Sequence, residues 1–264
     1  MGRALIGGLI NAGHPPDRIR VADPVEPCRE ALVADFGIVA FNDANAAAHE
    51  TDVVVLAVKP QQMREAVENL GLAAPQALYI SVAAGITLSR LEDWLGGACA
   101  IVRCMPNTPA LIGRGAAALY ANAAASADQR DIASGLLSAV GSVEWLANES
   151  QMDAVTAVSG SGPAYFFLLI ELLENAGCEL GLAPELSRRL ALQTAAGACE
   201  LAANSDEDAK TLRRRVTSPG GTTERAINAF ESAGLGGIVA DAVKAACERS
   251  VELAAITEKA PDGK

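Results

Sequence analysis

Histidine is scarce in this chain of 264 residues, which contains only His14 and His49. Its six cysteines form no C-x-x-C pair, the spacing that zinc sites commonly use. We therefore predict no metal site. Both histidines fall in segments expected at the surface, one in a Pro-Pro turn and one in an Ala-rich helix. This placement argues against hydrolases that use a Ser-His-Asp or Cys-His arrangement.

Long apolar runs are also lacking, because none approaches the roughly 18 residues that a membrane helix needs. The apolar stretch near Met1 is short and interrupted by Gly7-Gly8, which is not typical of a signal peptide. We expect the cysteines to be buried small hydrophobic residues in a reducing compartment, and the protein to be cytoplasmic. The cysteines are Cys28, Cys99, Cys104, Cys178, Cys199 and Cys247.

Basic residues are fewer than acidic ones: the chain has 21 Lys and Arg and 32 Asp and Glu, so its formal net charge is −11. This balance argues against nucleic acid or an anionic membrane as the main partner. Half of the residues are hydrophobic and 20% are charged, so the chain can form a substantial core and is not disordered. Its length suits one large or two ordinary domains.

The first 146 residues alternate between strand-like and helix-like segments, which predicts a mostly parallel sheet with helices on both faces. The expected strands are Ile19–Ala22, Ile38–Ala40, Val53–Val58, Leu78–Val82, Ala100–Cys104, Ala116–Tyr120 and Ser142–Leu146. The expected helices between them include Glu26–Asp35, Gln61–Leu70, Leu88–Leu95 and Asp128–Val140. We therefore predict an α/β, doubly wound, Rossmann-type domain over residues 1–148.

Beyond Asn148 the strand signals stop, and residues 149–258 are predicted to form an all-helical domain, followed by a tail at 259–264. The expected helices are Ser150–Val158, Ala164–Leu180, Pro184–Ala203, Thr223–Ser232 and Ile238–Thr257. Several carry Ala, Leu and Val on more than one face, so they need a second surface for burial. An intertwined homodimer meets that need.

One candidate binding site lies at the carboxyl ends of the predicted strands, where open α/β sheets bind ligands. Asp23 ends a strand 21 positions after Gly2, the distance at which dinucleotide-binding folds place an acidic residue for the ribose hydroxyl. The strand and the first two glycines of that fingerprint would have to precede Gly2. An ordinary turn at Asp23-Pro24 is the alternative.

A second candidate is the segment Thr217–Thr223, in which one Pro and two Gly precede a predicted helix. Backbone amides at such a helix N-terminus, together with the helix dipole, can bind a carboxylate. A simple loop with an N-cap Thr is the alternative. Likewise, Arg213–Arg215 is expected to be a solvated helix face, and Ser159–Pro163 could be a helix break.

Five motifs in order resemble the pyrroline-5-carboxylate reductase family over residues from Met1 to about Leu253. They are Ala57-Val58-Lys59-Pro60-Gln61, Ala83-Ala84-Gly85-Ile86-Thr87, Met105-Pro106-Asn107-Thr108-Pro109, Ser159-Gly160-Ser161-Gly162-Pro163-Ala164-Tyr165 and Val216-Thr217-Ser218-Pro219-Gly220-Gly221-Thr222-Thr223. The resemblance implies reduction of the cyclic imine 1-pyrroline-5-carboxylate to L-proline with NADPH or NADH. It also implies a Rossmann domain joined to a helical domain that interlocks two subunits.

The resemblance assigns roles to particular residues. Gly2 matches the last glycine of the nucleotide loop, and Glu149 matches an acidic residue near the substrate. The residues implied to lie along the cofactor are Gly2, Asn45, Ala57, Val58, Lys59, Pro60, Ala83, Ala84 and Asn107, of which Asn45 is displaced by one position. Asp23 joins this set through its spacing from Gly2. The loop implied to hold the substrate, supplied by the partner subunit, contains Ser218, Gly220, Gly221, Thr222 and Thr223.

The expected chemistry requires little acid–base catalysis from the side chains, because the cofactor carries the hydride. We expect the Thr223 hydroxyl to hydrogen-bond the ring nitrogen and the substrate carboxylate to sit on open amides around Gly220–Thr222. Asp23 favours the free ribose hydroxyl of NADH, whereas the family often uses NADPH. We therefore predict NAD(P)H as the cofactor without choosing between the two. We also expect a form extended upstream by about 10–15 residues, a strand and a turn, to be the active one.

Two other readings keep part of this architecture. A β-hydroxyacid dehydrogenase or another imine reductase would share the fold, but such relatives usually rely on a catalytic Lys in the helical domain. Only Lys210 and Lys244 lie there before the tail, and neither adjoins a glycine-rich turn. A non-catalytic binding protein, including a truncated form of the reductase, is the remaining alternative.

Overall fold

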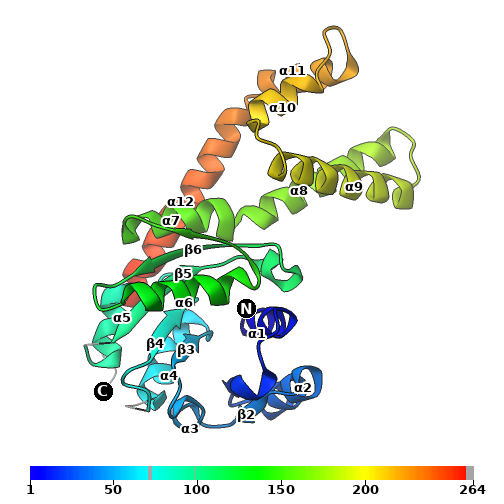
Figure 1. The fold of residues 1–264 in the computed structure, drawn as a ribbon. Coiled ribbons are helices and arrows are strands. Elements are labelled where there is room, and N and C mark those ends of the chain that lie inside the picture. Colours follow the sequence, from blue (N-terminus) through cyan, green and yellow to red (C-terminus); the bar gives the residue numbers. More distant parts are fainter. Residues whose placement is uncertain (71–72, 98, 260–264) are drawn as a thin grey trace. The chain divides into compact units, whose positions relative to one another are not determined.

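The computed structural model describes residues 1–70, 73–97 and 99–259 (Figure 1). The chain forms two compact units, one made of Met1–Ser161 with the chain from Ala246 onward, and one made of Gly162–Ala245. This division differs from the one expected at residue 148. It differs because the turns after Asn148 pack with the sheet unit, and because the last helix returns to that unit. Of the expected tail, residues 260–264 lie outside the described part.

The main sheet of the first unit has five strands in the order β3-β4-β5-β6-β7. Strands β3, β4 and β5 are parallel, β6 is antiparallel to β5, and β7 is parallel to β6. The strands span Val53–Leu56, Leu78–Ser81, Ala100–Met105, Gly115–Ala121 and Gly141–Trp145. The predicted mostly parallel sheet is therefore confirmed, with a reversal after β5.

Two further strands, β1 (Arg20–Ala22) and β2 (Val39–Phe41), form a separate parallel pair. Within the described residues, no strand pairs with the other edge of β1 or of β3. The parallel strands of this unit are consequently divided into a two-stranded and a five-stranded sheet. Helix α2 (Glu26–Phe36) connects β1 to β2, and α3 (Ala44–Ala48) connects β2 to β3.

Helices cover both faces of the five-stranded sheet (Figure 1). On one face, α1 (Gly2–Asn11) and α6 (Ala127–Ser138) contribute to a core that includes Ile80 and Val102. On the other face, α4 (Met63–Leu70) and α5 (Leu88–Leu95) pack around Tyr79 and Ile101. Neighbouring residues of one strand thus enter opposite cores, which explains the continuous apolar runs in the sequence.

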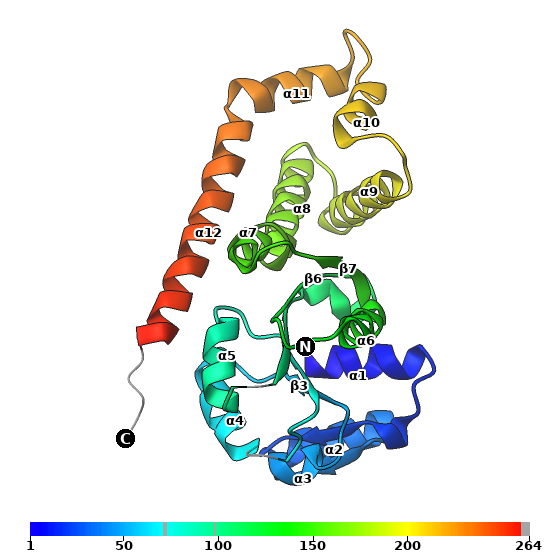
Figure 2. The same ribbon diagram turned by 60° about the vertical axis from the view of Figure 1, so that its left-hand side comes forward.

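The second unit is entirely helical in the described chain and contains α8 (Gly162–Glu179), α9 (Pro184–Ala203), α10 (Ala209–Arg215) and α11 (Thr222–Ser232). Helices α8 and α9 lie side by side (Figure 2). Helix α12 (Leu235–Lys259) begins in this unit and ends in the first.

Large apolar side chains on these helices are exposed in the single chain. Phe167 is 65% exposed, and Phe166 and Ile238 are also open to solvent. Of the cysteines, only Cys104 is buried, whereas Cys28, Cys178 and Cys199 are exposed, so the prediction of burial is wrong for those three. Cys178 and Cys199 are exposed because α8 and α9 are covered on few sides in one chain.

The helical stretch Glu149–Glu179 is long and apolar enough to cross a membrane by length and composition, with a mean hydropathy of 1.3 in its most apolar window. The expectation that no apolar run approaches this length was therefore wrong. Only 11% of that window is buried in the chain. The test is weak evidence for a membrane, because helices of soluble proteins also pass it.

Candidate active site

The carboxyl ends of β3 and β4 carry two short segments that include the small residues Ala57, Ala83 and Ala84. After β3, Ala57, Val58 and Lys59 are exposed, while Pro60 is partly buried. After β4, Ala83 is buried and Ala84 is exposed. Parallel strands end at the same edge of their sheet, so both segments lie where such sheets bind ligands. Small side chains at this edge leave the backbone accessible, as an extended ligand requires.

Gly2 lies beside the first of these segments. It begins α1, and a Cβ atom added to it would lie 3.5 Å from the Cβ of Ala57. The structure thus brings Gly2 and Ala57 together, although they are 55 positions apart in the sequence. Apart from the family motifs, no sequence pattern links the two residues. A glycine at a helix start beside a strand end fits the approach of a pyrophosphate to backbone amides.

Asp23 directly follows β1 and forms the turn expected there. Its Oδ1 accepts a hydrogen bond from the Val25 amide at 2.8 Å, and its backbone carbonyl accepts one from Arg29 Nη1 at 2.7 Å. The turn is therefore fixed through both the side chain and the backbone carbonyl of Asp23. An ordered acidic residue at this strand end suits recognition of a ribose hydroxyl.

Two asparagines implied to contact the cofactor are already engaged within the protein. Asn45 Nδ2 donates to the Leu70 carbonyl at 3.0 Å, which links α3 to the end of α4. Asn107 Nδ2 donates to the Ser159 carbonyl at 3.1 Å, and its Oδ1 accepts from the Ala116 amide at 2.9 Å. These side chains hold neighbouring elements together, so a ligand would meet them through their remaining atoms or their backbone.

The Ser159–Pro163 motif begins inside a π-helical turn, Thr156–Gly160, that follows α7 (Met152–Val155). Ser161 N donates to the Thr156 carbonyl at 2.8 Å across this wide turn. Turns of this kind often occur at functional sites. Asn107 therefore joins the end of β5 to an irregular helix, a feature that no sequence periodicity signals.

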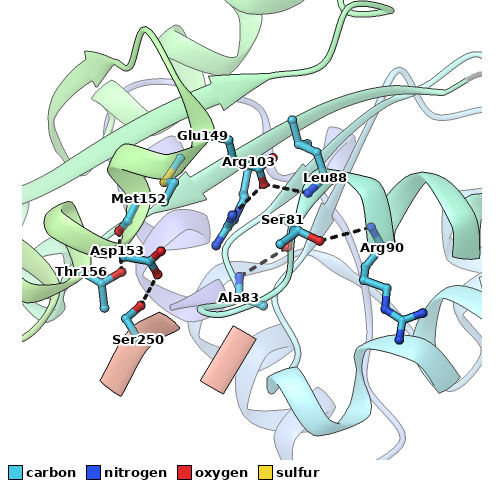
Figure 3. Close-up of polar contacts among 11 residues, drawn as sticks. Ser81, Ala83, Leu88, Arg90, Arg103, Glu149, Met152, Asp153, Thr156 and Ser250 are labelled. Atoms are coloured by element: carbon cyan, nitrogen blue, oxygen red, sulfur yellow. Dashed lines mark hydrogen bonds and ion pairs between the residues drawn. The ribbon is translucent and has the colours of Figure 1, made fainter. Parts of the chain in front are cut away.

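Glu149 lies at the start of the short turn η4 (Glu149–Gln151), and its carboxylate is well engaged (Figure 3). Its Oε1 accepts from Arg103 Nη1 at 2.6 Å and from the Leu88 amide at 2.8 Å. The Arg103 side chain is only 8% exposed. Sequence reasoning missed Arg103, although a charged residue inside the apolar run of β5 was an available signal.

The second half of α12 packs against the same region. Ser250, itself buried, donates a hydrogen bond from its Oγ to Asp153 Oδ1 at 2.6 Å (Figure 3). Gly85, with φ of +74°, would place an added Cβ 3.6 Å from the Ala254 amide. The last helix of the chain thus contacts both α7 and the loop that follows β4.

Thiol chemistry is not available within the sheet. Burial raises the pKa of the Cys104 thiol to about 12, so it stays protonated at neutral pH. Burial also raises the pKa of Cys99. A thiol that remains protonated is a poor nucleophile, which agrees with a reaction that needs no covalent intermediate.

In the second unit, the predicted substrate loop precedes α11. The Gly220 amide donates to Glu224 Oε2 at 2.8 Å, and the Gly221 amide donates to the Ser218 carbonyl at 3.0 Å. The expectation of open amides is therefore wrong for these two glycines, because the loop bonds to itself. Thr222 and Thr223 open the helix, and its N-cap, Gly221, provides no side-chain cap. The accessible donors thus begin at Thr222.

The arginines upstream of this loop are largely engaged with acidic neighbours. Arg215 pairs with Glu207 at 2.6 Å and Arg213 with Glu231 at 3.5 Å, and both arginine side chains are about half exposed or more. They form the solvated face that the sequence predicts.

Two family models match the chain. One, described as NADP oxidoreductase coenzyme F420-dependent, matches residues 1–85, and one described as pyrroline-5-carboxylate reductase dimerisation matches residues 149–253. The first covers α1, β1 and the strand ends that carry Ala57 and Ala83. The second begins at Glu149 and includes the loop before α11.

Similar proteins extend along nearly the whole chain. Pyrroline-5-carboxylate reductase of Pseudomonas aeruginosa is 51% identical, covering 96% of this chain and 93% of that protein. A solved pyrroline-5-carboxylate reductase from Coxiella burnetii is 41% identical with a TM-score of 0.92, covering 96% and 94% of the two chains. The Plasmodium falciparum pyrroline carboxylate reductase, solved with NADP bound, is 31% identical with a TM-score of 0.85 and the same coverage.

Proposed function

This chain belongs to the pyrroline-5-carboxylate reductase family, and we propose here which of its residues serve the reaction. The reaction is the reduction of 1-pyrroline-5-carboxylate to L-proline with NAD(P)H, the last step of proline biosynthesis. The observation that carries the residue assignments is the uncapped start of α11, where Thr222 and Thr223 lie in the family's substrate motif.

The residues that would hold the cofactor are those gathered in the first unit. Gly2 beside Ala57 would meet the pyrophosphate, and Asp23 would accept hydrogen bonds from the adenosine ribose. The segments after β3 and β4 would line the remainder, with Val58, Lys59, Pro60, Ala83, Ala84, Asn45 and Asn107 along it. Bound NAD(P)H supplies the hydride. NADPH is supported by the relative solved with NADP bound.

The substrate-binding role falls to the loop before α11. Its amides at Thr222 and Thr223, with the positive end of the helix dipole, would bind the substrate carboxylate. The Thr223 hydroxyl would donate or accept a hydrogen bond at the ring nitrogen, orienting it and relaying its proton. Ser218, Gly220 and Gly221 would shape the loop through the hydrogen bonds described above.

We further propose that two copies of the chain form the working unit in the cytoplasm. The exposed apolar faces of α8 and α12 need a cover, and a second copy supplies one without a membrane. The match of residues 149–253 to a dimerisation model supports this assembly. In it, the loop with Thr223 would serve the cofactor held by the partner subunit.

A comparison of substrates tests the reaction. Purified in the form expected from the sequence to be active, the protein should oxidise NADPH when 1-pyrroline-5-carboxylate is added, and should reduce no NADP+ when 3-hydroxyacids are added. The second reaction would be expected of a β-hydroxyacid dehydrogenase. The absorbance of NADPH checks both reactions, because it falls in the first and would rise in the second. Proline is measured in parallel. Turnover of 3-hydroxyacids without turnover of the imine would contradict the assignment.

A further inference from the structure

One charged side chain lies inside the five-stranded sheet. Arg103 lies in β5, between β4 and β6 of the five-stranded sheet, where it is aligned with Ser81 on one side and Tyr120 on the other. It is 7% exposed. A buried guanidinium needs an anionic partner, because an unpaired charge away from water is costly. Glu149 is that partner, at 2.6 Å.

The same carboxylate oxygen also reaches a helix start. Glu149 Oε1 accepts from the amide of Leu88, the first residue of α5. The N-cap residue Thr87 accepts from the Arg90 amide at a long 3.4 Å and does not serve the Leu88 amide. A carboxylate at a helix N-terminus gains from both the free amide and the helix dipole. One oxygen thus joins β5, the start of α5 and the turn η4 (Figure 3).

This junction fixes the loop between β4 and α5, which carries Ala83 and Ala84. Glu149 bonds the residue at the end of the loop, and the backbone of α12 lies close to Gly85 in its middle. Its start continues directly from β4. These contacts restrict the six-residue loop that carries the exposed Ala84. No contact between Glu149 and a substrate is needed for this effect.

We propose that Arg103 and Glu149 are a positioning pair that fixes the Ala83–Thr87 loop for NAD(P)H, and that Glu149 does not touch the substrate. The inference rests on the proposed cofactor site and deepens it. Removing the Glu149 carboxylate would leave the Leu88 amide without this acceptor and the Arg103 charge without this ion pair. The loop would then sample several positions before the cofactor binds. Affinity for the cofactor would then fall by the cost of reordering it.

The test compares Glu149→Ala and Glu149→Gln with Glu144→Gln, a matched control on the exposed face of β7. Glutamine keeps an oxygen for the Leu88 amide but removes the charge that faces Arg103. Three quantities are measured on the full chain. They are the Kd for NADPH by fluorescence without substrate, the hydrogen exchange of amides 83–88 without cofactor, and the KM for pyrroline-5-carboxylate at saturating NADPH.

We expect Glu149→Ala to raise the Kd for NADPH by about 10-fold or more, the size of a lost hydrogen bond to a charged group. Exchange at 83–88 should accelerate, while the KM for the imine stays within about twofold, because the substitution removes no contact with the substrate. Glu149→Gln should lie between Glu149→Ala and wild type, and it decides the matter if Glu149→Ala does not fold. Glu144→Gln should match wild type.

An unchanged Kd for NADPH in folded Glu149→Gln and Glu149→Ala would overturn the proposal. So would a raised KM for the imine with an unchanged Kd for NADPH, because Glu149 would then touch the substrate. Failure of the wild type to reduce pyrroline-5-carboxylate would count against the reaction instead. The Kd and the exchange rates, measured without substrate, would still decide the role of the pair.

Discussion

At the scale of single residues, Thr223 is the side chain on which the proposed chemistry depends most. It is the second residue of α11, and the N-cap position before it is occupied by Gly221. Its hydroxyl therefore does not cap the helix. A hydroxyl with no capping role at a helix start is available to a ligand, so its removal should affect the reaction more than the fold.

Thr223→Ala should lower kcat by roughly 30- to 1000-fold, which corresponds to about 2–4 kcal/mol of barrier for one positioned hydrogen bond. Thr223→Ser retains the hydroxyl and should keep most of the activity. Steady-state kinetics with both substrates saturating, together with thermal melting, separates the two effects. If Thr223→Ala turns over at a rate near that of the wild type, the hydroxyl has no part in the reaction.

At the scale of elements, the pairing of β6 with β7 depends on a close approach of two glycines. Gly115 and Gly141 are register partners at the start of the two strands. A Cβ atom on Gly141 would lie 1.9 Å from the Gly115 carbonyl oxygen, and the φ of Gly141 is +154°. The obstacle is backbone rather than a flexible side chain, so the strands would have to separate.

Gly141→Ala should therefore destabilise the protein by at least about 2 kcal/mol, in the range of other overpacked sites. Gly135 provides the matched control, because it lies on the exposed side of α6 with nothing within 4 Å of an added Cβ. Gly135→Ala should stabilise by up to about 1 kcal/mol through helix propensity. Urea unfolding of both variants measures the difference. Equal midpoints would show that the β6–β7 approach imposes no constraint.

The elements differ in how far the sequence predicts them. The apolar runs and caps predict α5 and α9 with the same bounds as in the structure, Leu88–Leu95 and Pro184–Ala203. These signals are local. The reversal of β6 and the π-helical turn at Thr156–Gly160 depend on packing and were not predicted.

The site was predictable to a similar degree. Its motifs identify the strand ends and the start of α11, because glycine, proline and small residues mark those turns. The engagement of Gly220 by Glu224, and of Glu149 by Arg103 across 46 positions, could not be read from spacing. Contacts between distant segments exist only once the sheet has formed, so sequence periodicity does not predict them.

At the scale of the whole molecule, the two halves of the proposed chemistry belong to different compact units. The cofactor-lining residues lie in the first unit, and the loop before α11 lies in the second. Helix α12 passes from one unit to the other, and Ser250 in its second half donates a hydrogen bond to Asp153. The exposed apolar faces of the second unit indicate a partner, and two copies would allow each loop to serve the other chain's cofactor.

Mixing two inactive variants tests this central claim most directly. Thr223→Ala removes the proposed substrate group, and Ala57→Glu adds a negative charge beside Gly2 where the pyrophosphate would bind. The measurement is NADPH-dependent formation of proline by the two variants alone and after their subunits are exchanged. The account predicts that exchange restores about one quarter of wild-type activity, because half of the dimers are mixed and each has one intact site. Activity no greater than the sum of the separate variants would contradict a reductase site shared between two chains.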